Sequence, residues 1–555
     1  MRKIIFSTML TMASLMNTQA QDAVFTYFNY KGADSRFAKA INPEKEFFNP
    51  VLAGFYPDPS ICRKGDTYYL VNSSFAFYPG VPIFESKDLV NWQQTGHVLE
   101  RDSQLQLAGQ WVSGGIYAPA ISYNKQNDTF YMITTNVGKG NFFVKTKDPH
   151  KGWSDPVFLP RIDGIDPSFL FDTDGKAYIV HNAPVFGTAS YEGQRAIRLL
   201  EFDVATEQTV GEPIEIVRGG THVTTNPIWI EGPHLYHIGK YYYLMCAEGG
   251  TGDGHSEVVF RSHSPKGPWE ECPFNPILTQ RSGLSEDRPD KVTSTGHADL
   301  IQTKEGEWWA LFLGCRPYEA GMYNTGRDTY LLPVTWSDGW PVILEKGKAV
   351  PTVVEVKNRK LETRDNLLTG NFSYSDRFQP DILHSRWVSL RNPIPGAYTL
   401  SDNGLTLHPS TGNIRQTTPL SALFCRQQHT TFEAETELRF SPISQKRFAG
   451  ITVFQDEKHH ILFGKTRLSD GTPALVVRRM ENTDILVASQ PIDADAPVRL
   501  KIKADGRYYS FYYSEGTDRT WHPLAVGLDG AHLSTDRSGG FIGAMIGLYA
   551  TKPGE

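Results

Sequence analysis

Three carboxylic acids in this chain stand in short motifs that contain proline, although they are far apart along the sequence. Asp58 lies in Tyr56-Pro57-Asp58-Pro59-Ser60, Asp166 in Ile165-Asp166-Pro167-Ser168, and Glu231 in Ile230-Glu231-Gly232-Pro233-His234. Taken singly, such an acid beside a proline is more often a turn-capping residue. If the fold brings all three into one pocket, they could perform acid/base chemistry there.

The three motifs belong to a repeat of five units built from short strands and turns. In each unit a turn signal opens a strand of apolar, mostly aromatic residues, and the motif lies about ten residues upstream. A period of roughly 45 to 70 residues suits the blades of a β-propeller, whose innermost strands start beside one central axis. We therefore expect Asp58, Asp166 and Glu231 to occupy the same place in their units and to converge on that axis. The five turn-and-strand segments span residues 65–69, 127–131, 174–178, 239–243 and 306–310.

Length and pattern predict an all-β chain of two domains. At 555 residues the chain exceeds what one hydrophobic core usually holds. The aromatic repeat stops after Trp340-Pro341-Val342, and alternating strand patterns follow a polar stretch. We expect a five-bladed β-propeller over residues 45–345, a linker over 346–366, and an antiparallel, jelly-roll-like β-sandwich over 367–555.

Charge and the start of the chain restrict its partners and its location. The formal net charge is -6, and no basic run stands out, which argues against nucleic acid or an anionic membrane as partner. Residues 1–20 resemble a cleavable signal peptide, with Arg2 and Lys3 before an apolar run. No later stretch is long enough to span a membrane, and no cysteine at the cleavage point could carry a lipid anchor. We expect a periplasmic or secreted protein.

The five cysteines, Cys62, Cys246, Cys272, Cys315 and Cys425, show no C-x-x-C spacing. The sequence therefore contains no obvious zinc or redox motif. Because the number is odd, at least one is unpaired, and we interpret them as small buried hydrophobic residues.

Five motifs, in this order along the chain, resemble those of glycoside hydrolase family 43. The similarity covers both domains and is closest to members with a C-terminal β-sandwich, the β-xylosidases and α-L-arabinofuranosidases. It implies that Asp58 is the general base, Glu231 the general acid, and Asp166 the residue that tunes and orients the acid. An inverting glycosidase needs such a pair of carboxyls, roughly 6.5 to 9.5 Å apart. The motifs are those at residues 56–60, 164–168, 231–234, 295–300 and 326–329.

The resemblance also implies residues that bind the sugar. Arg327 matches an arginine that hydrogen-bonds a sugar hydroxyl, although Asp328 stands where the family commonly has Glu; the alternative for Arg327 is a surface salt bridge. Aromatic walls are expected from Phe77 and Tyr117, and Phe541 resembles a residue that closes the pocket from the sandwich. β-Xylosidases of this type usually have Trp in place of Tyr117, which leaves room for an arabinofuranosidase.

For His297 the resemblance implies a position near the axis, in relatives sometimes beside a calcium ion whose other ligands are waters. The alternative is a hydrogen-bonded histidine that supports the carboxylates from behind. We expect no required cofactor, with structural calcium as the one candidate and His297 as its protein ligand.

The expected substrate is a plant cell-wall oligosaccharide or polysaccharide, attacked at a chain end or side branch. Arabinofuranose and xylose remain open as the sugar released; xylan, xyloglucan side chains, arabinan and pectin remain open as its source, and the oligomeric state is open as well. The Asn-Asp-Pro-Asn-Gly type of motif that retaining fructan-cleaving enzymes use is missing from residues 56–60. A non-catalytic, glycan-binding propeller is the alternative from another class of protein.

Overall fold

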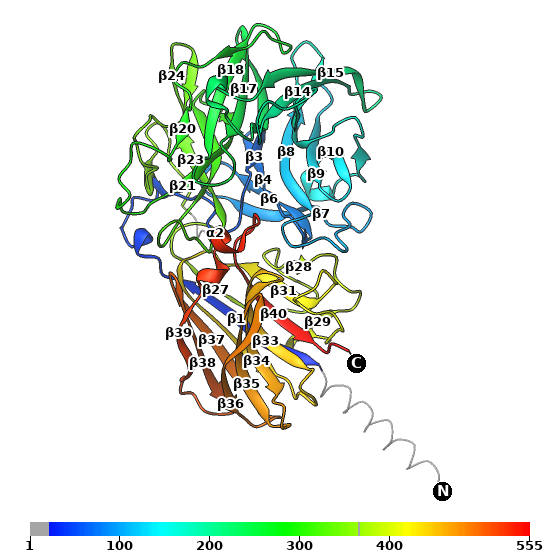
Figure 1. Cartoon of the computed structure of the whole chain (residues 1–555), viewed down its shortest axis with the longest axis vertical. Coiled ribbons are helices and arrows are strands. Elements are labelled where there is room, and N and C mark those ends of the chain that lie inside the picture. Colours follow the sequence, from blue (N-terminus) through cyan, green and yellow to red (C-terminus); the bar gives the residue numbers. More distant parts are fainter. Residues whose placement is uncertain (1–21, 364–366, 555) are drawn as a thin grey trace, which may run out of the picture. The chain divides into compact units, whose positions relative to one another are not determined.

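The computed structural model describes residues 22–363 and 367–554, and these residues form two compact units made almost entirely of β-strands (Figure 1). The described residues between 35 and 370 form a β-propeller, and residues 22–34 together with 371–554 form a β-sandwich. The predicted fold class, a five-bladed propeller with an antiparallel sandwich, is thus confirmed. The expected signal peptide at residues 1–20 lies outside the described residues.

Five antiparallel sheets make up the blades in the described part of the propeller. Tight turns with a glycine in left-handed conformation, such as Gly65 at φ 61° and Gly239 at φ 64°, join the first two strands of blades 1 and 4. Blades 1 and 2 consist of β3 (Ser60–Lys64), β4 (Thr67–Val71), β6 (Gly80–Ser86) and β7 (Gln93–Leu99), then β8 (Ile116–Asn124), β9 (Thr129–Asn136), β10 (Gly140–Thr146) and β11 (Val157–Phe158). Blade 3 consists of β12 (Ile165–Phe171), β13 (Ala177–Pro184), β14 (Arg195–Asp203) and β15 (Gln208–Arg218). Blades 4 and 5 consist of β16 (Glu231–Ile238), β17 (Tyr241–Glu248), β18 (Ser256–Ser262), β19 (Glu270–Glu271) and β20 (Leu278–Thr279), then β21 (Thr293–Gln302), β22 (Trp308–Cys315) and β23 (Arg327–Pro333).

The first strand of each blade contacts the first strand of the next, so that β3, β8, β12, β16 and β21 form a closed ring. Buried aromatic and aliphatic side chains fill the space between neighbouring blades; Phe143, Phe169 and Phe202, for example, pack together between blades 2 and 3. The ring is closed by the backbone: the N–H groups of Val51 and Leu52 donate to the Thr329 carbonyl of β23, just before the chain enters β3. This closure leaves the starts of the five inner strands facing one axis.

The second unit is a sandwich of two antiparallel sheets, which face each other through contacts such as that of Phe463 with Phe511, whose ring centroids are 5.4 Å apart. The six-stranded sheet has the order β31 (Ser421–Arg426), β40 (Met545–Thr551), β33 (Phe448–Asp456), β34 (His459–Arg467), β35 (Pro473–Glu481) and β36 (Thr483–Pro491). The other sheet has the order β29 (Tyr398–Ser401), β30 (Gly404–Leu407), β1 (Ala23–Gly32), β32 (Thr431–Arg439), β37 (Val498–Asp505), β38 (Tyr508–Glu515) and β39 (His522–Asp529), with β27 (Ser373–Asp376) also paired to β1.

Two segments differ from the domain boundaries that we expect from the sequence. Strand β1 comes from the start of the chain, which we had assigned to neither domain, and it lies between β30 and β32 of the sandwich. The segment expected to be a linker contains β26 (Val353–Glu355), which pairs with β2 (Glu46–Phe48) inside the propeller unit. In both cases the paired strands are hundreds of residues apart in the sequence, and such pairing cannot be predicted from a local sequence pattern.

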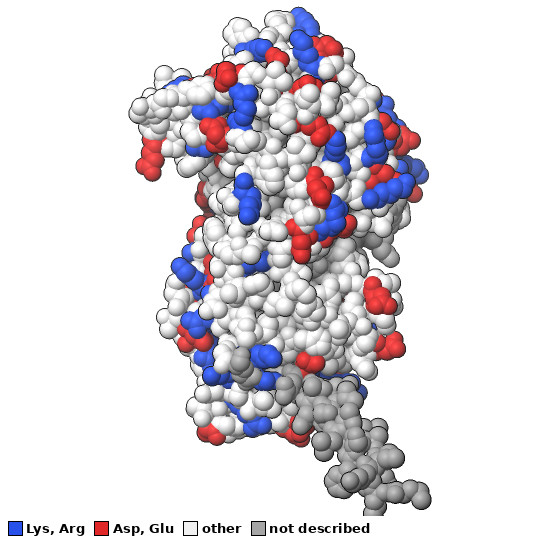
Figure 2. Space-filling view, turned by 90° about the vertical axis from the view of Figure 1, so that its right-hand side faces the viewer, with Lys and Arg blue, Asp and Glu red and all other residues white. Residues whose placement is uncertain are grey.

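Surface charge and cysteine placement agree with the composition. On the face that Figure 2 shows, basic and acidic residues are interspersed, and neither sign gathers into a large field. All five cysteines are buried and free of disulfide bonds, as their sequence context indicated. In the described part of the chain, no helix has the length and apolar character to cross a membrane.

Candidate active site

The inner strands share an irregularity at the end that reaches the axis. Pairing with the second strand of the blade skips two residues, between Tyr117 and Ala120 in β8, between Ile165 and Ser168 in β12, and between Glu231 and His234 in β16. Asp166 is therefore the first skipped residue of its blade, whereas Glu231 is the last paired residue before the skip. The prediction that the three carboxylates occupy one equivalent place is wrong for Glu231, because Gly232 takes the place that corresponds to Asp166.

The irregularity turns side chains toward the axis. Asp58, Asp166, Gly232 and His297 all have left-handed backbone, with φ between 52° and 55°. For a residue other than glycine this conformation costs about 1–3 kcal/mol, and such strain is typical of functional sites. These four residues line a narrow space on the axis, together with Ala118 of β8. The repeat thus delivers one residue per blade to the same point.

Asp58 is surrounded by groups that favour its ionised form. Arg327 Nη1 donates to Asp58 Oδ1 at 2.8 Å, and Ser73 Oγ donates to Oδ2 at 2.6 Å. Burial opposes ionisation, but the charge of Arg327 and the hydrogen bond from Ser73 outweigh it, so that the pKa of Asp58 lies below its usual range. Asp58 can therefore accept a proton near neutral pH.

Asp166 and Glu231 are in the opposite situation. Burial raises the pKa of Asp166, and the nearby charge of Asp58 raises it further. Burial also raises the pKa of Glu231, with Asp166 and then Asp58 as the next causes. The Gly232 N–H donates to Asp166 Oδ2 at 3.1 Å, while no hydrogen bond reaches the Glu231 carboxyl from the described residues. Glu231 therefore retains a proton and has it free to donate.

A hydrogen-bonded ring behind the carboxylates fixes the inner strands to one another. Asp299 of β21 accepts from Ser60 Oγ of β3 at 2.8 Å and from Tyr236 Oη of β16 at 2.6 Å. Ser60 Oγ in turn accepts from the Ile121 N–H, and Ser168 Oγ donates to the Pro233 carbonyl at 2.6 Å. These bonds join the inner strands in the order β8, β3, β21, β16 and β12, and Ser122 Oγ of β8 donates to the Phe169 carbonyl of β12 at 3.3 Å, which completes the ring and makes the site rigid.

The expected sugar-binding arginine reaches the site. Arg327 begins β23, is 5 % exposed and pairs with Asp58, so it is not part of a surface salt bridge. The next residue, Asp328, points the other way and forms a fully buried pair with Arg316, at 2.8 Å and 3.0 Å. Asp328 therefore stabilises β23 through its pair with Arg316, and the Arg327 side chain points toward Asp58.

The aromatic residues near the site differ in their contacts: Tyr117 and Phe75 contact each other, whereas Phe77 packs against Phe55. The ring centroids of Tyr117 and Phe75 are 5.1 Å apart, and the centroid of the Phe75 ring lies 5.8 Å from the guanidinium carbon of Arg327. Phe77, the residue we expected at the sugar, is 1 % exposed and packs against Phe55 at 6.1 Å. Phe75 is 2 % exposed and thus buried like Phe77, so the half-buried Tyr117 is the member of this group that remains beside the acids.

An exposed tryptophan beside Glu231 was not predicted. Trp229 is 44 % exposed, and the Arg195 guanidinium lies 5.7 Å from its ring. Arg195 also donates to Asn182 Oδ1 at 2.9 Å, and Asn182 Nδ2 donates to the Ile230 carbonyl at 2.5 Å. Together these bonds anchor the segment that carries both Trp229 and Glu231. Ser73 and Arg195 were missed because neither lies in the motifs of the repeat.

His297 lies at the axis, where Nδ1 is 3.6 Å from Asp58 Oδ1. Burial lowers its pKa to about 4, so the ring is neutral and a possible ligand. However, no group of three or more His, Cys, Asp or Glu side chains in the described residues is arranged to hold a metal, and the axial space is about 10 Å³, room for about one water. Calcium remains a prediction and enters no step below.

Phe541 belongs to the sandwich unit and lies between α2 (Thr535–Ser538) and β40. Its expected part in closing the pocket stays a prediction.

Three buried carboxyls near the axis of a five-bladed propeller, one favoured as a carboxylate and two as protonated acids, are groups that acid/base cleavage of a glycosidic bond could use. Comparison with protein families agrees: residues 47–341 match the model "Glycosyl hydrolases family 43", and residues 375–555 match "Beta xylosidase C-terminal Concanavalin A-like domain". The chain belongs to glycoside hydrolase family 43 and is a glycosidase.

Relatives extend over nearly the whole chain. A xylosidase/arabinosidase of Butyrivibrio fibrisolvens is 38% identical over 520 residues, which covers 91% of this chain and 96% of the relative. The non-reducing end alpha-L-arabinofuranosidase BoGH43B of Bacteroides ovatus is 34% identical and covers 92% of each. A solved structure of a GH43_12 protein from a capybara gut metagenome has a TM-score of 0.88 and 42% identity, with 96% of this chain and 99% of that chain covered.

Proposed function

We propose that the chain is an exo-acting, inverting glycosidase that releases terminal α-L-arabinofuranose, β-D-xylose or both from plant cell-wall glycans. The observation that carries this proposal is the opposed protonation of two carboxyls at one axis: Asp58 is ionised beside Arg327, while Glu231 keeps its proton beside Asp166. An inverting reaction needs one group of each kind.

In the proposed reaction Asp58 acts as general base. A water oxygen attacks the anomeric carbon, and Asp58 accepts the proton that this water loses. Glu231 gives its proton to the glycosidic oxygen as the bond between that oxygen and the anomeric carbon breaks. Asp166 keeps Glu231 protonated until that moment, and the configuration of the released sugar is inverted.

Arg327 has two tasks in this scheme. Its pair with Asp58 keeps the base ionised, and a planar guanidinium in this position is suited to recognise hydroxyl groups of the bound sugar. Tyr117, which is half-buried, supplies apolar surface against which a sugar ring can pack, and the buried ring of Phe75 packs against Tyr117. The leaving group would depart on the side of Glu231, where the exposed ring of Trp229 offers a surface for a further sugar.

The activities named for the relatives support both sugars. The Butyrivibrio protein is a xylosidase/arabinosidase, and the Bacteroides protein an arabinofuranosidase that acts at non-reducing ends. Tyr117, where β-xylosidases usually have Trp, supports arabinofuranose as the better substrate. We further propose that the protein is exported to the periplasm or the medium, where such glycans are available as substrates.

The test compares initial rates on 4-nitrophenyl α-L-arabinofuranoside and 4-nitrophenyl β-D-xylopyranoside, with Glu231→Gln as control, and follows the anomer released by proton NMR. We expect hydrolysis of at least one substrate and first appearance of the inverted anomer. Release of the retained anomer would contradict the mechanism, and inactivity on both substrates would contradict the proposed sugars.

A further inference from the structure

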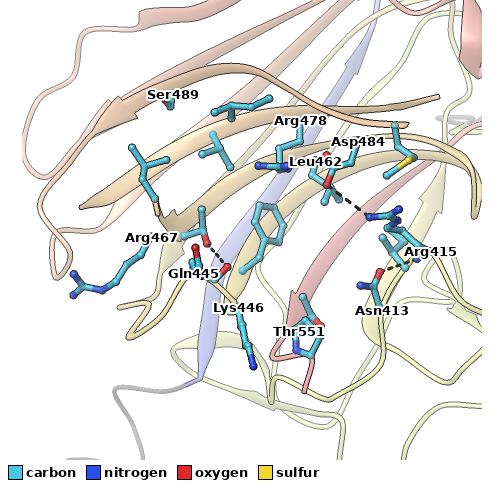
Figure 3. A pocket seen from close by; sticks show the side chains of 18 of the residues that line it. Asn413, Arg415, Gln445, Lys446, Leu462, Arg467, Arg478, Asp484, Ser489 and Thr551 are labelled. Carbon is cyan, nitrogen blue, oxygen red and sulfur yellow. Dashed lines mark hydrogen bonds and ion pairs between the residues drawn. The ribbon is translucent and has the colours of Figure 1, made fainter. Parts of the chain in front are cut away.

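The sandwich unit contains a hollow of about 660 Å³ that is separate from the propeller axis (Figure 3). It lies on the face of the six-stranded sheet that points away from the other sheet, because Leu462 and Thr466 line it, whereas Phe463 between them packs against Phe511 of the opposite sheet. The volume is in the range of pockets that bind small ligands.

The floor is open because two glycines stand side by side in the sheet. One row across the strands reads Tyr549, Gly450, Gly464, Val476 and Ser489. A Cβ atom on either glycine would come within 2.6 Å of the other glycine's Cα, so the close approach of the strands excludes any side chain there. Tyr549, Val476 and Ser489 line the hollow around this bare centre.

Both apolar and cationic side chains line the hollow. Phe448 and Leu462 contribute apolar surface, and Arg415, Lys446, Arg467 and Arg478 contribute positive charge. On one side Arg415 and Arg478 meet at Asp484, and on the other Lys446 and Arg467 extend from strand ends (Figure 3).

The positive charge of the hollow exceeds its negative charge. Asp470 and Asp484 are the two carboxylates in the lining, against four cationic side chains. Asp484 is shared by Arg478 at 2.9 Å and Arg415 at 3.8 Å, and Asp470 accepts from the Thr472 N–H of its own turn. In a chain of net charge -6 this local excess of cations is informative. Lys446 and Arg415 are exposed at the rim, where an anion can reach them.

We propose that this hollow is a second carbohydrate site, which binds a short acidic oligosaccharide through a uronate carboxylate. The carboxylate would lie at the rim beside Lys446, and the apolar face of the sugar over Phe448 and Leu462, with Arg415 on the other side of the hollow adding to its positive charge. A simple inorganic anion would leave the apolar floor and most of the volume unused. The choice of a carbohydrate rests on the glycosidase class of the chain, and not on which sugar the active site releases.

The experiment is a calorimetric titration of the full-length Glu231→Gln enzyme, which should not consume the ligand. The probe is xylotriose that carries one 4-O-methylglucuronate, and the neutral comparison is xylotetraose. We expect the acidic probe to bind more tightly than the neutral one, and added salt to weaken its binding. The double variant Arg415→Ser/Lys446→Ser should weaken it about five-fold, as expected when one exposed charge pair and a further nearby cation are lost.

The matched control is Lys31→Ser/Arg519→Ser, which removes two exposed cations from the strand β1 and the loop after β38, both in the opposite sheet. This variant should bind the probe like the parent. Equal binding of acidic and neutral probes, unchanged binding in Arg415→Ser/Lys446→Ser, or equally effective competition by inorganic phosphate would each overturn the proposal. Because Arg415→Ser/Lys446→Ser in the active enzyme should hydrolyse 4-nitrophenyl glycosides at the parent rate, failure of this site is distinguishable from failure of the proposed activity.

Discussion

The two sides of the propeller axis use the same chemical group in opposite ways. Asp58 receives hydrogen bonds from Arg327 and Ser73 and is held ionised. Glu231 is also buried but has no such donor among the described residues, and, after burial, the charge of another acid, Asp166, does most to raise its pKa. The comparison teaches that the neighbours of a buried carboxyl, rather than its burial, decide whether it can act as base or acid.

The largest effects should come from removing either carboxyl. Asp58→Asn and Glu231→Gln should each lower kcat by about 10²–10⁴-fold, because each removes one proton transfer. The two variants should differ in one respect: Glu231→Gln should lose less activity on 4-nitrophenyl glycosides than on disaccharides, since nitrophenolate departs without a proton. Steady-state kinetics on both substrate types checks this, and equal losses would contradict the assignment of Glu231 as acid.

Removal of the cation beside the base should have the next largest effect. Without Arg327 the ionised form of Asp58 loses its main support, so its pKa should rise and the acidic limb of the kcat/KM profile should move to higher pH. Arg327→Ala should also lose about 10²-fold in kcat/KM, because a sugar contact disappears. Arg327→Lys is the matched control, which should recover part of the shift because it keeps the charge.

A smaller effect is expected from Asp166→Asn. The charge of Asp166 raises the pKa of Glu231, so its removal should lower that pKa and move the basic limb of the profile to lower pH. Asp172→Asn is the control in the same blade, because Asp172 bonds His237 and Tyr242 instead of the site. It should lower the melting temperature and leave the pH profile unchanged; a basic limb that stays in place in Asp166→Asn would refute the coupling.

The smallest effect should come from Ser73→Ala. Loss of one hydrogen bond to a carboxylate costs about 1 kcal/mol, which corresponds to roughly five-fold in kcat/KM. The neighbouring Ser74 accepts a hydrogen bond from the Val81 N–H at 3.0 Å and does not touch Asp58. Ser74→Ala should therefore change thermal stability without a change in the acidic limb, whereas Ser73→Ala should move that limb slightly to higher pH.

Much of this site could be predicted because it repeats. The spacing of the motifs predicted the propeller, and the convergence of Asp58, Asp166 and His297 on one axis followed from their equivalent positions. The offset of Glu231 could not be predicted in this way, because the skip in strand pairing before Pro233 is a property of the backbone register.

Residues outside the repeat left no sequence signal. Ser73 and Arg195 reach the acids from segments whose composition is ordinary, and only tertiary structure reveals their contacts. The hollow in the sandwich is another such case, since its bare floor depends on two glycines that lie in different strands and meet across them.

Strand β1 has a consequence for biosynthesis. It is made at the start of the chain, yet its partner β32 is made about 400 residues later, on the order of tens of seconds at ordinary rates of translation. Until then an apolar strand has an unpaired edge, which makes it prone to aggregation. A fragment that begins at residue 371 would lack the strand between β30 and β32, so the sandwich should be produced only from chains that include residues 22–34.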